Sequence, residues 1–378
     1  MAVRHATGLG LHLKTTDRIL SLRQCAERAR TWYSIYNLEL AMSEILGRLP
    51  SIATSDSTVP IDLLGGEPER TISDVPMDLG SQTSRPLFPG GKRHVAQPGD
   101  QTGMPGQSGM YGEDGESSRQ LSFRVRLCQI SHHIIAKLYS PTQPQSWSAV
   151  QQVIAECQGR LDQWREGLPA DLILHGSNML DNDLRGKVDL ALYYHSTTMI
   201  LYRPCLCNIS IPNESASSRD FNLTGAYRCV QAATTLVDTL PAKPSAQEVA
   251  RLLPWWNLLH YLCQVIAVFI LELSQGSRSF TTKQLLPFIR KAMSYLWCLT
   301  AESLSAYRAW RMFRRMLVVL TFRYGELDVA DIPLEAVAPI GWTDRDEALM
   351  EQTLGPLVET GMPRNSARGG QAADNTND

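Results

Sequence analysis

The stretch that most constrains the fold is residues 27–62, which read ERARTWYSIYNLELAMSEILGRLPSIATSDSTVPID. Apolar and aromatic side chains recur there three and four residues apart, which predicts a helix with a wide buried stripe. Gly47 follows Leu46 where a left-handed C-cap residue would lie, and Pro50 comes soon after, so we expect the helix to end at Leu46. Residues 51–60 are rich in Ser, Thr and Asp and predict an extended surface loop.

The same spacing of apolar side chains recurs along most of the chain. It predicts the end of a helix within residues 1–13, closed by Gly8 or Gly10, and a series of longer helices further on. These longer helices are expected at residues 121–139, 146–166, 184–203, 224–240, 252–273, 284–300 and 301–324. An apolar content of 43% supports a real core. The sequence therefore predicts an all-α, multi-helix domain.

Two segments lack this spacing. Residues 65–120 are dominated by Gly, Pro, Ser, Gln and Asp, so they cannot bury enough apolar surface to offset the entropy that ordering would cost. We expect a disordered insert there and a disordered tail at residues 346–378. The domain organisation that follows is a first helical part at residues 1–64, the insert, the remainder of the helical domain at residues 121–345, and the tail.

The eight cysteines do not form the pattern of a structural zinc site. Cys205 and Cys207 are the closest pair, and a single intervening residue is not a zinc-site spacing. Most of the others fall in apolar helical stretches, which favours buried, reduced thiols in an intracellular protein. The eight residues are Cys25, Cys128, Cys157, Cys205, Cys207, Cys229, Cys263 and Cys298.

Two polar groups have both a structural and a chemical interpretation. Asp181, Asn182 and Asp183 precede a predicted helix and suit its N-terminal cap, whereas a magnesium site would need a second acidic motif that the sequence does not show. His195 has the chemistry of a general base, but no nucleophile with an acidic orienting group is visible. A histidine that makes a hydrogen bond inside a helical core is the interpretation that we favour.

Four arginines lie close together, at Arg308, Arg311, Arg314 and Arg315. Such a cluster is able to contact phosphates. Because these arginines alternate with apolar residues, we favour the solvent-exposed face of a helix instead. A net charge of −2 gives the chain no overall attraction to nucleic acid.

Residues 252–273 are the most apolar stretch. A membrane-spanning helix needs about 20 apolar residues, and here Asn257, His260 and Gln264 place polar groups on one face. Such groups are costly in lipid and ordinary in a packed core, so we expect a buried central helix rather than a membrane span.

Several short motifs, in a fixed order, resemble the middle homology region of fungal zinc-cluster transcription factors. The helix rich in Arg, Trp and Tyr leads into a Gly-Arg-x-Pro turn, a later helix ends in Leu-x-x-Trp before a Leu-Pro turn, and a Tyr-His helix ends in an Arg-Pro pair. The residues that carry this signature, with an expected structural role, are Trp32, Gly47, Arg48, Pro50, Trp164, His195, Arg203 and Pro204.

The resemblance covers about residues 2–64 and 121–325. It implies the all-α regulatory domain of a nuclear transcription factor that controls transcription by RNA polymerase II. In this family an N-terminal binuclear zinc cluster of six cysteines reads DNA, and this sequence has no such run of cysteines. Residues 9–12, Leu-Gly-Leu-His, resemble the end of a family helix that lies well inside the domain. The resemblance therefore implies that the chain starts within the domain, either as a natural short form or as a gene model that lacks its front.

The resemblance also sets the expected cofactors and partners. It implies no cofactor in this chain, zinc only in full-length family members, and DNA contact only through the missing N-terminal module. The expected partners are the transcription machinery, a homodimer partner or a small-molecule effector, and no membrane. We expect no catalytic, cofactor-binding or metal-ligating residue and hence no enzyme. The alternatives left open are a helical enzyme with an unrecognised site and a membrane-associated helical protein.

Overall fold

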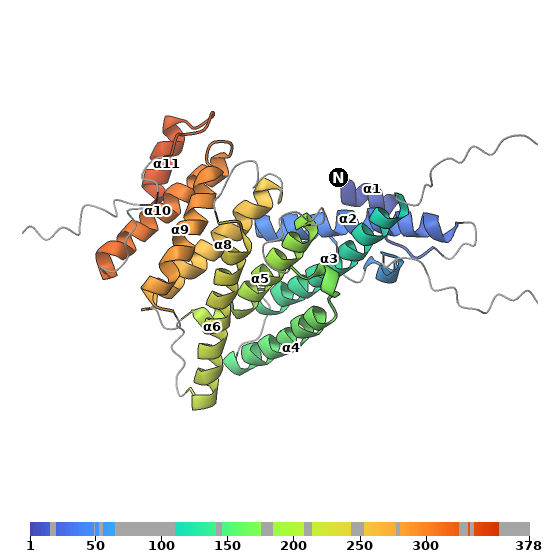
Figure 1. Cartoon of the computed structure of the whole chain (residues 1–378), viewed down its shortest axis with the longest axis horizontal. Helices are drawn as coiled ribbons and strands as arrows, with labels where there is room; N and C mark the ends of the chain where they lie inside the picture. Colours follow the sequence, from blue (N-terminus) through green and yellow to red (C-terminus); the bar gives the residue numbers. More distant parts are fainter. Residues whose placement is uncertain are drawn as a thin grey trace, which may run out of the picture. The chain divides into compact units, whose positions relative to one another are not determined.

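The computed structural model describes twelve ranges of the chain, and within them every regular element is a helix, which confirms the all-α prediction (Figure 1). The chain forms two compact units, Met1–Cys128 and Gln129–Asp378. Most of the predicted insert and tail lies outside the described residues. Those described are 1–15, 20–48, 50–52, 56–64, 110–140, 146–174, 184–207, 214–242, 253–276, 280–324, 332 and 336–354.

The first unit is organised around one long helix. It contains α1 (Ala2–Gly8), α2 (Leu22–Leu46), the 3-10 helix η2 (Ile61–Leu64) and the first part of α3 (Met110–Leu138). Ser21 and Gln24 form a reciprocal capping box at the start of α2, which satisfies backbone N–H groups that would otherwise lack partners. α1 is fixed to α2 because a guanidinium nitrogen of Arg28 donates to the carbonyls of Leu9 and Gly10, at 3.3 and 3.2 Å.

The second unit contains the rest of α3 and seven further α-helices among its described residues. These helices carry their labels in Figure 1. α5 and α6 approach each other closely at Gly225 of α6, because glycine has no side chain to keep the two helices apart. A Cβ atom at Gly225 would lie 2.7 Å from the Cys205 sulfur on α5. The seven helices are α4 (Trp147–Glu166), α5 (Leu184–Leu206), α6 (Ala216–Thr239), α8 (Trp255–Ser274), α9 (Thr282–Cys298), α10 (Leu304–Tyr324) and α11 (Asp344–Leu354), with the 3-10 helix η3 (Ala170–Leu172) after α4.

α8 corresponds to the most apolar stretch of the sequence. In the part of the chain that the structure describes, it is the one helix whose length and composition would allow a membrane span. Leu262, Val265 and Phe269 are nevertheless fully buried within the second unit, and Gln264 accepts a hydrogen bond of 2.5 Å from the Ser196 hydroxyl on α5. This packing is what the prediction of a buried central helix requires.

Two helices begin earlier than predicted. α3 begins at Met110 instead of residue 121, because adding residues to a helix that is already formed costs little and Ser118 accepts a hydrogen bond of 3.3 Å from Arg30 on α2. α6 begins at Ala216, where a loop was expected. Its first turns are rich in Ser and Asn because these side chains cap the helix and bond to a neighbouring helix.

Two further departures occur at helix ends. α5 does not end at Arg203 and Pro204 but continues to Leu206, for a reason given below. Residues 344–354, placed mostly in the predicted disordered tail, form α11. α11 has no apolar periodicity from which it could be predicted. Ion pairs with α10, rather than a buried apolar stripe, hold it in place.

Candidate functional site

The Gly-Arg-x-Pro turn of the first unit has the predicted geometry. Gly47 has a φ of 62° and a ψ of 27°, the left-handed conformation that a residue without a Cβ adopts most readily. Its N–H donates to the carbonyl of Glu44, and the N–H of Arg48 donates to the carbonyl of Ser43, at 3.2 and 3.0 Å. The turn therefore takes up two of the carbonyls that the end of α2 leaves without intrahelical partners.

Glu39 is the residue to which the turn is fastened. Its two carboxylate oxygens accept from the two terminal nitrogens of Arg48, at 2.9 and 3.1 Å, and one of them also accepts from the Ser51 N–H at 3.1 Å and its hydroxyl at 2.5 Å. Burial alone would raise the pKa of Glu39, but the hydrogen bonds from Arg48 and Ser51 outweigh it and lower the pKa to about 2. No local pattern indicates this role of Glu39, because Arg48 and Ser51 lie beyond the end of the helix that carries it.

The loop after the turn is also attached to α2. The indole N–H of Trp32, whose residue is 1% exposed, donates to the Ser57 hydroxyl at 2.9 Å. The phenol of Tyr33 donates to the carbonyl of Val59 at 2.5 Å. Ile52 and Val59 are buried, so this part of the loop is docked on the core instead of lying freely on the surface. The signature residues Trp32, Gly47 and Arg48 thus all hold the turn and its loop against α2. Pro50 lies between Arg48 and Ser51, the two residues that bond to Glu39.

Trp164 is buried and His195 is partly buried in the second unit. The Trp164 indole stacks on the Tyr194 ring, with centroids 5.7 Å apart and an interplanar angle of 15°, and the Tyr194 ring in turn meets the His195 ring at a centroid distance of 5.4 Å. Burial, reinforced by the nearby charge of Arg165, lowers the pKa of His195 to about 4. The imidazole is therefore neutral near pH 7 and packs as part of an aromatic cluster.

The Arg203-Pro204 pair explains why α5 continues. Pro204 has no N–H to donate to the carbonyl of Ile200, one turn earlier. The hydroxyl of Tyr139 supplies that donor, at 2.7 Å, and the guanidinium of Arg203 lies over the Tyr139 ring at 4.8 Å. Burial raises the pKa of Tyr139 to about 12, so the hydroxyl keeps its proton. Tyr139 was missed in the sequence because nothing in its local spacing indicates this contact.

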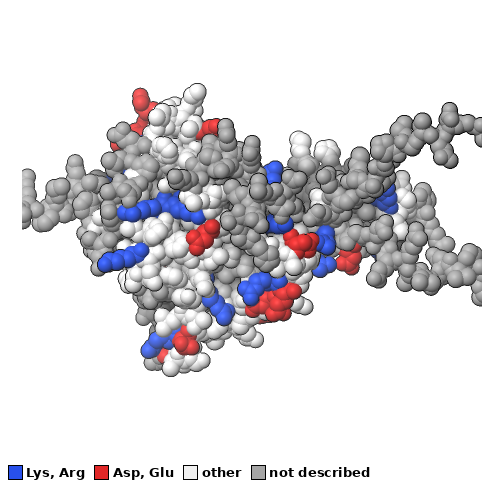
Figure 2. Space-filling view, viewed as in Figure 1, with Lys and Arg blue, Asp and Glu red and all other residues white. Residues whose placement is uncertain are grey.

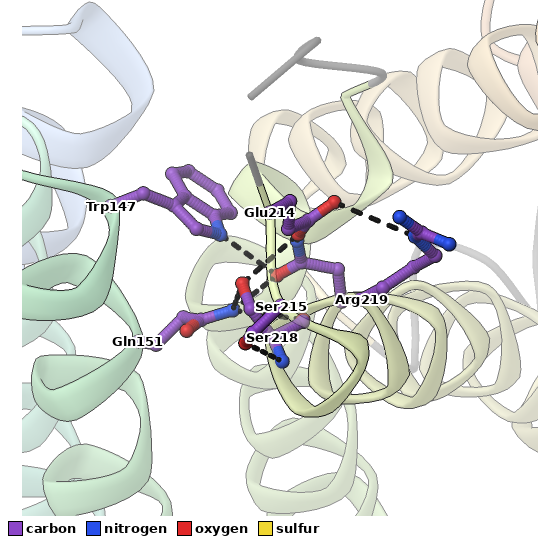
Figure 3. A network of polar contacts seen from close by, with 7 residues as sticks. Trp147, Gln151, Glu214, Ser215, Ser218 and Arg219 are labelled. Carbon is purple, nitrogen blue, oxygen red and sulfur yellow. Dashed lines mark hydrogen bonds and ion pairs between the residues drawn. The ribbon is translucent and has the colours of Figure 1, made fainter. Parts of the chain in front are cut away.

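A polar network connects the N-terminal ends of α4 and α6 (Figure 3). The Asn222 carbonyl oxygen accepts from the Trp147 indole at 3.0 Å and from the Gln151 amide at 2.8 Å. The same Gln151 nitrogen donates to the Ser218 hydroxyl at 2.9 Å. Glu214 accepts from the Asn222 amide at 2.7 Å and from the Ser218 hydroxyl at 3.0 Å. These partly buried bonds fix the direction of the two helices and were not predicted.

A second polar chain runs across α4, α5 and α6. The hydroxyl of Tyr202 donates to Gln158 at 2.9 Å and accepts from Arg228 at 2.6 Å. Gln158 donates in turn to Asp162 at 2.7 Å. Together with the network at the helix starts, these hydrogen bonds align α6 with α4, which carries Trp164, and with α5, which carries His195 and Arg203.

Two arginines of the cluster make ion pairs that the sequence pattern did not indicate. Arg308 pairs with Asp346 and Arg311 pairs with Glu347 of α11, and the two arginine side chains remain 50% and 28% exposed. The Arg314 guanidinium lies 5.9 Å from the Trp310 ring centroid. On the face of the molecule in Figure 2, acidic and basic side chains lie next to each other at several places.

Of the residues proposed for other chemistry, Asp181, Asn182 and Asp183 lie outside the described residues. Within the described ranges, no group of three or more His, Cys, Asp or Glu side chains is placed to hold a metal ion. All eight cysteines are free, and most are buried or partly buried, as the sequence suggested. Cys207 is exposed.

Comparison with known proteins relates part of this chain to a described protein domain. Residues 1–166 match the model of the fungal specific transcription factor domain. This segment contains Trp32, the Gly-Arg-x-Pro turn and Trp164, whereas His195, Arg203 and Pro204 lie beyond it. No solved structure matches the chain significantly.

Curated relatives extend the similarity past residue 166. The transcription regulator galc of Aspergillus niger is 26% identical over 372 residues, which cover 88% of this chain and 45% of that protein. The nitrogen assimilation transcription factor nirA of Emericella nidulans is 24% identical over 62% of this chain and 23% of its own length. The transcription factor FBD3 of Fusarium pseudograminearum is 26% identical over 69% of this chain and 33% of its own length.

The chain thus spans less than half the length of each of these relatives. The domain match and the relatives together support a fungal transcription factor domain in this chain and a transcription regulator as its functional class.

Proposed function

We propose that this chain is the helical regulatory domain of a fungal transcription regulator that acts in the nucleus on transcription by RNA polymerase II. The observation that carries the proposal is the domain match over residues 1–166. The same segment holds the turn that Glu39, Arg48 and Ser51 fasten to α2. The relatives that match this chain along most of its length carry names of transcription regulators.

In this proposal the domain does not read DNA by itself. DNA and zinc binding belong to an N-terminal zinc-cluster module of the kind that the family uses, since the eight cysteines here lack the spacing of such a cluster. The helical domain sets the activity of that module through contacts with the transcription machinery, with a homodimer partner or with a small-molecule effector. A net charge of −2 is consistent with a domain whose partners are not nucleic acids.

A reporter experiment tests this function. The full chain is fused to an unrelated DNA-binding domain and expressed in fungal cells with a reporter that carries the matching site. We expect the fusion to concentrate in the nucleus and to change reporter output relative to the DNA-binding domain alone. The proposal would be refuted by a fusion that is folded and present at the promoter but neither raises nor lowers reporter output.

Matched variants connect the effect to the turn. Glu39→Gln removes the carboxylate that holds Arg48 and Ser51, and we expect it to shift the reporter output of the fusion. Glu27→Gln is the control, because Glu27 makes an exposed ion pair with Arg23, one turn away on α2, and such pairs contribute little. Equal output from both variants would show that the turn has no part in the regulatory effect.

A further inference from the structure

α11 is held against α10 by charge and by one aromatic ring. Arg308 pairs with Asp346 and Arg311 pairs with Glu347, and Figure 1 shows α11 next to α10 and at an angle to it. Arg308 and Arg311 are one turn apart and face the same helix, so they form a pair of fixed positive charges. We call Tyr307, Arg308 and Arg311 the arginine face.

Trp342 occupies the centre of the arginine face. Its ring meets the Tyr307 ring at a centroid distance of 4.9 Å and an interplanar angle of 73°. The guanidinium groups of Arg308 and Arg311 lie 5.6 and 5.8 Å from the Trp342 ring, within the range of cation–π attraction. The indole N–H donates to Glu347 at 3.0 Å. The arginine face therefore binds a tryptophan and two carboxylates at once.

The segment that supplies these groups is shaped before it docks. Gly341 has a φ of 96°, which favours glycine, and the N–H of Trp342 closes the turn on Pro339 at 3.1 Å. Thr343 and Asp346 cap the start of α11 reciprocally, at 3.1 Å from the Thr343 N–H and 3.3 Å from the Asp346 N–H. The result places Trp342, Asp346 and Glu347 on one side of a short helix. We call residues 342–347 the acidic segment.

The acidic segment is nonetheless weakly attached. No described side chain of α11 is buried, and Leu349 on α11 is 59% exposed. Arg308 is half exposed in its ion pair, and ion pairs near solvent contribute little to stability and weaken in salt. An isolated helix of 11 residues is shorter than the roughly 12–15 residues needed for marginal stability in water. Local opening at α11 therefore costs little compared with opening of the buried helices.

We infer that the arginine face is a docking surface for a partner protein segment in which a tryptophan is followed, one turn later, by two adjacent acidic residues. In the free chain, the acidic segment covers the arginine face, and binding of such a partner displaces it. Charge complementarity carries the inference, because the face offers two guanidinium groups and an aromatic edge in a fixed arrangement. The inference does not rest on a role in transcription, because peptide binding is measured with the purified chain.

A peptide competition experiment tests this inference. The probe is a fluorescent peptide with the sequence of residues 339–350, PIGWTDRDEALM, and binding to the full chain is followed by fluorescence anisotropy. In the wild-type chain the resident segment competes, so we expect weak binding. In the Asp346→Asn, Glu347→Gln double variant the resident segment is loosened, and we expect the probe to bind at least tenfold more tightly.

Changes in the peptide test specificity without affecting the folding of the protein. Probes with Trp342→Ala, or with both Asp346→Asn and Glu347→Gln, should lose at least tenfold in affinity for the loosened chain. On the protein side, Arg311→Glu in the loosened chain should abolish binding, whereas Arg314→Glu should not, because Arg314 lies over the Trp310 ring outside the arginine face. Circular dichroism checks that both variants keep their helix content.

Three results would overturn the inference. The first is an equal affinity of the probe for the wild-type and loosened chains. The second is binding that survives Arg311→Glu or the loss of the acidic side chains of the peptide. The third is dimerisation of the wild-type chain, measured by analytical ultracentrifugation, that the probe dissociates. That result would assign the arginine face to the acidic segment of a second copy instead of a different protein.

Discussion

Removal of the Glu39 carboxylate is the perturbation for which the structure gives the clearest expectation. Glu39→Gln keeps the size of the side chain but removes its charge, so Arg48 loses a two-point ionic contact and Ser51 loses a charged acceptor. The Glu39 side chain is 13% exposed and that of Arg48 is 44% exposed, so solvent weakens this interaction only in part. Hydrogen bonds to charged groups contribute about 1.5–3 kcal/mol each.

The lowered pKa of Glu39 gives the order of magnitude of this contribution, because it is the net of the burial that raises the pKa and the hydrogen bonds that lower it. A reduction from 4.5 to about 2 corresponds to about 3 kcal/mol of preference for the ionised form in the folded state. Because the folded-state pKa lies below the unfolded-state value, this stability is fully present above pH 4.5. It is lost as the pH falls from 4.5 toward 2, where the folded protein must also take up the proton. We therefore expect Glu39→Gln to lower the free energy of unfolding at pH 7 by about 1–3 kcal/mol.

The assay is urea denaturation of both proteins at several pH values between 7 and 2.5, followed by circular dichroism. The difference in the free energy of unfolding should be largest at pH 7 and should shrink as the pH falls below 4.5. Hydrogen exchange at pH 7 should locate the loss to the C-terminal turns of α2, and Glu27→Gln should leave it unchanged. A difference that stays constant from pH 7 to pH 2.5 would refute an electrostatic role for Glu39.

The other predictions concern the second unit. Tyr139→Phe leaves the Ile200 carbonyl without its donor, so the free energy of unfolding should fall by about 1–3 kcal/mol, with faster hydrogen exchange at the end of α5; unchanged exchange would contradict this. Gly225→Ala would place a methyl group 2.7 Å from the Cys205 sulfur, and overpacking of about 1–3 kcal/mol should exceed the helix-propensity gain of about 1 kcal/mol, so Tm should fall. Burial lowers the pKa of His260 to about 4, so stability should fall as the unfolded chain takes up a proton between pH 6.5 and 4. His260→Gln should reduce this acid loss, and an equal loss in denaturant titrations would exclude His260 as its source.

The helices that sequence reasoning located well are those with local end signals. Gly47 and Pro50 indicated the end of α2 correctly. α4 begins and ends within a residue of the prediction, because its apolar stripe runs from its first turn to its last. The start of α6 was missed because its serines and asparagine look like a loop until their partners on α4 are known. α11 was missed for the same reason, since the groups that hold it belong to α10.

The candidate site shows the same division between local and non-local information. The signature positions could be identified from short motifs, and a structural role was predicted for each. Glu39 and Tyr139, which fasten two of these motifs, could not be identified, because each makes its contact with a segment that lies elsewhere in the sequence. Single-sequence periodicity reports which face of a helix is buried, but not which neighbour supplies a hydrogen bond to it.

The Gly-Arg-x-Pro turn and the Arg-Pro pair have the same physical role. At each of them, hydrogen bonds satisfy helix carbonyls at a place where a glycine or a proline interrupts the regular backbone pattern. Gly47 ends α2 and Pro204 removes a donor from α5, and in each case an adjacent arginine fastens the site. Arg48 does so through two parallel bonds to a carboxylate, and Arg203 does so by stacking on a tyrosine. Lysine can do neither equally well. The signature therefore marks the scaffold, and partners are better sought where contacts are weakly held, as at the arginine face.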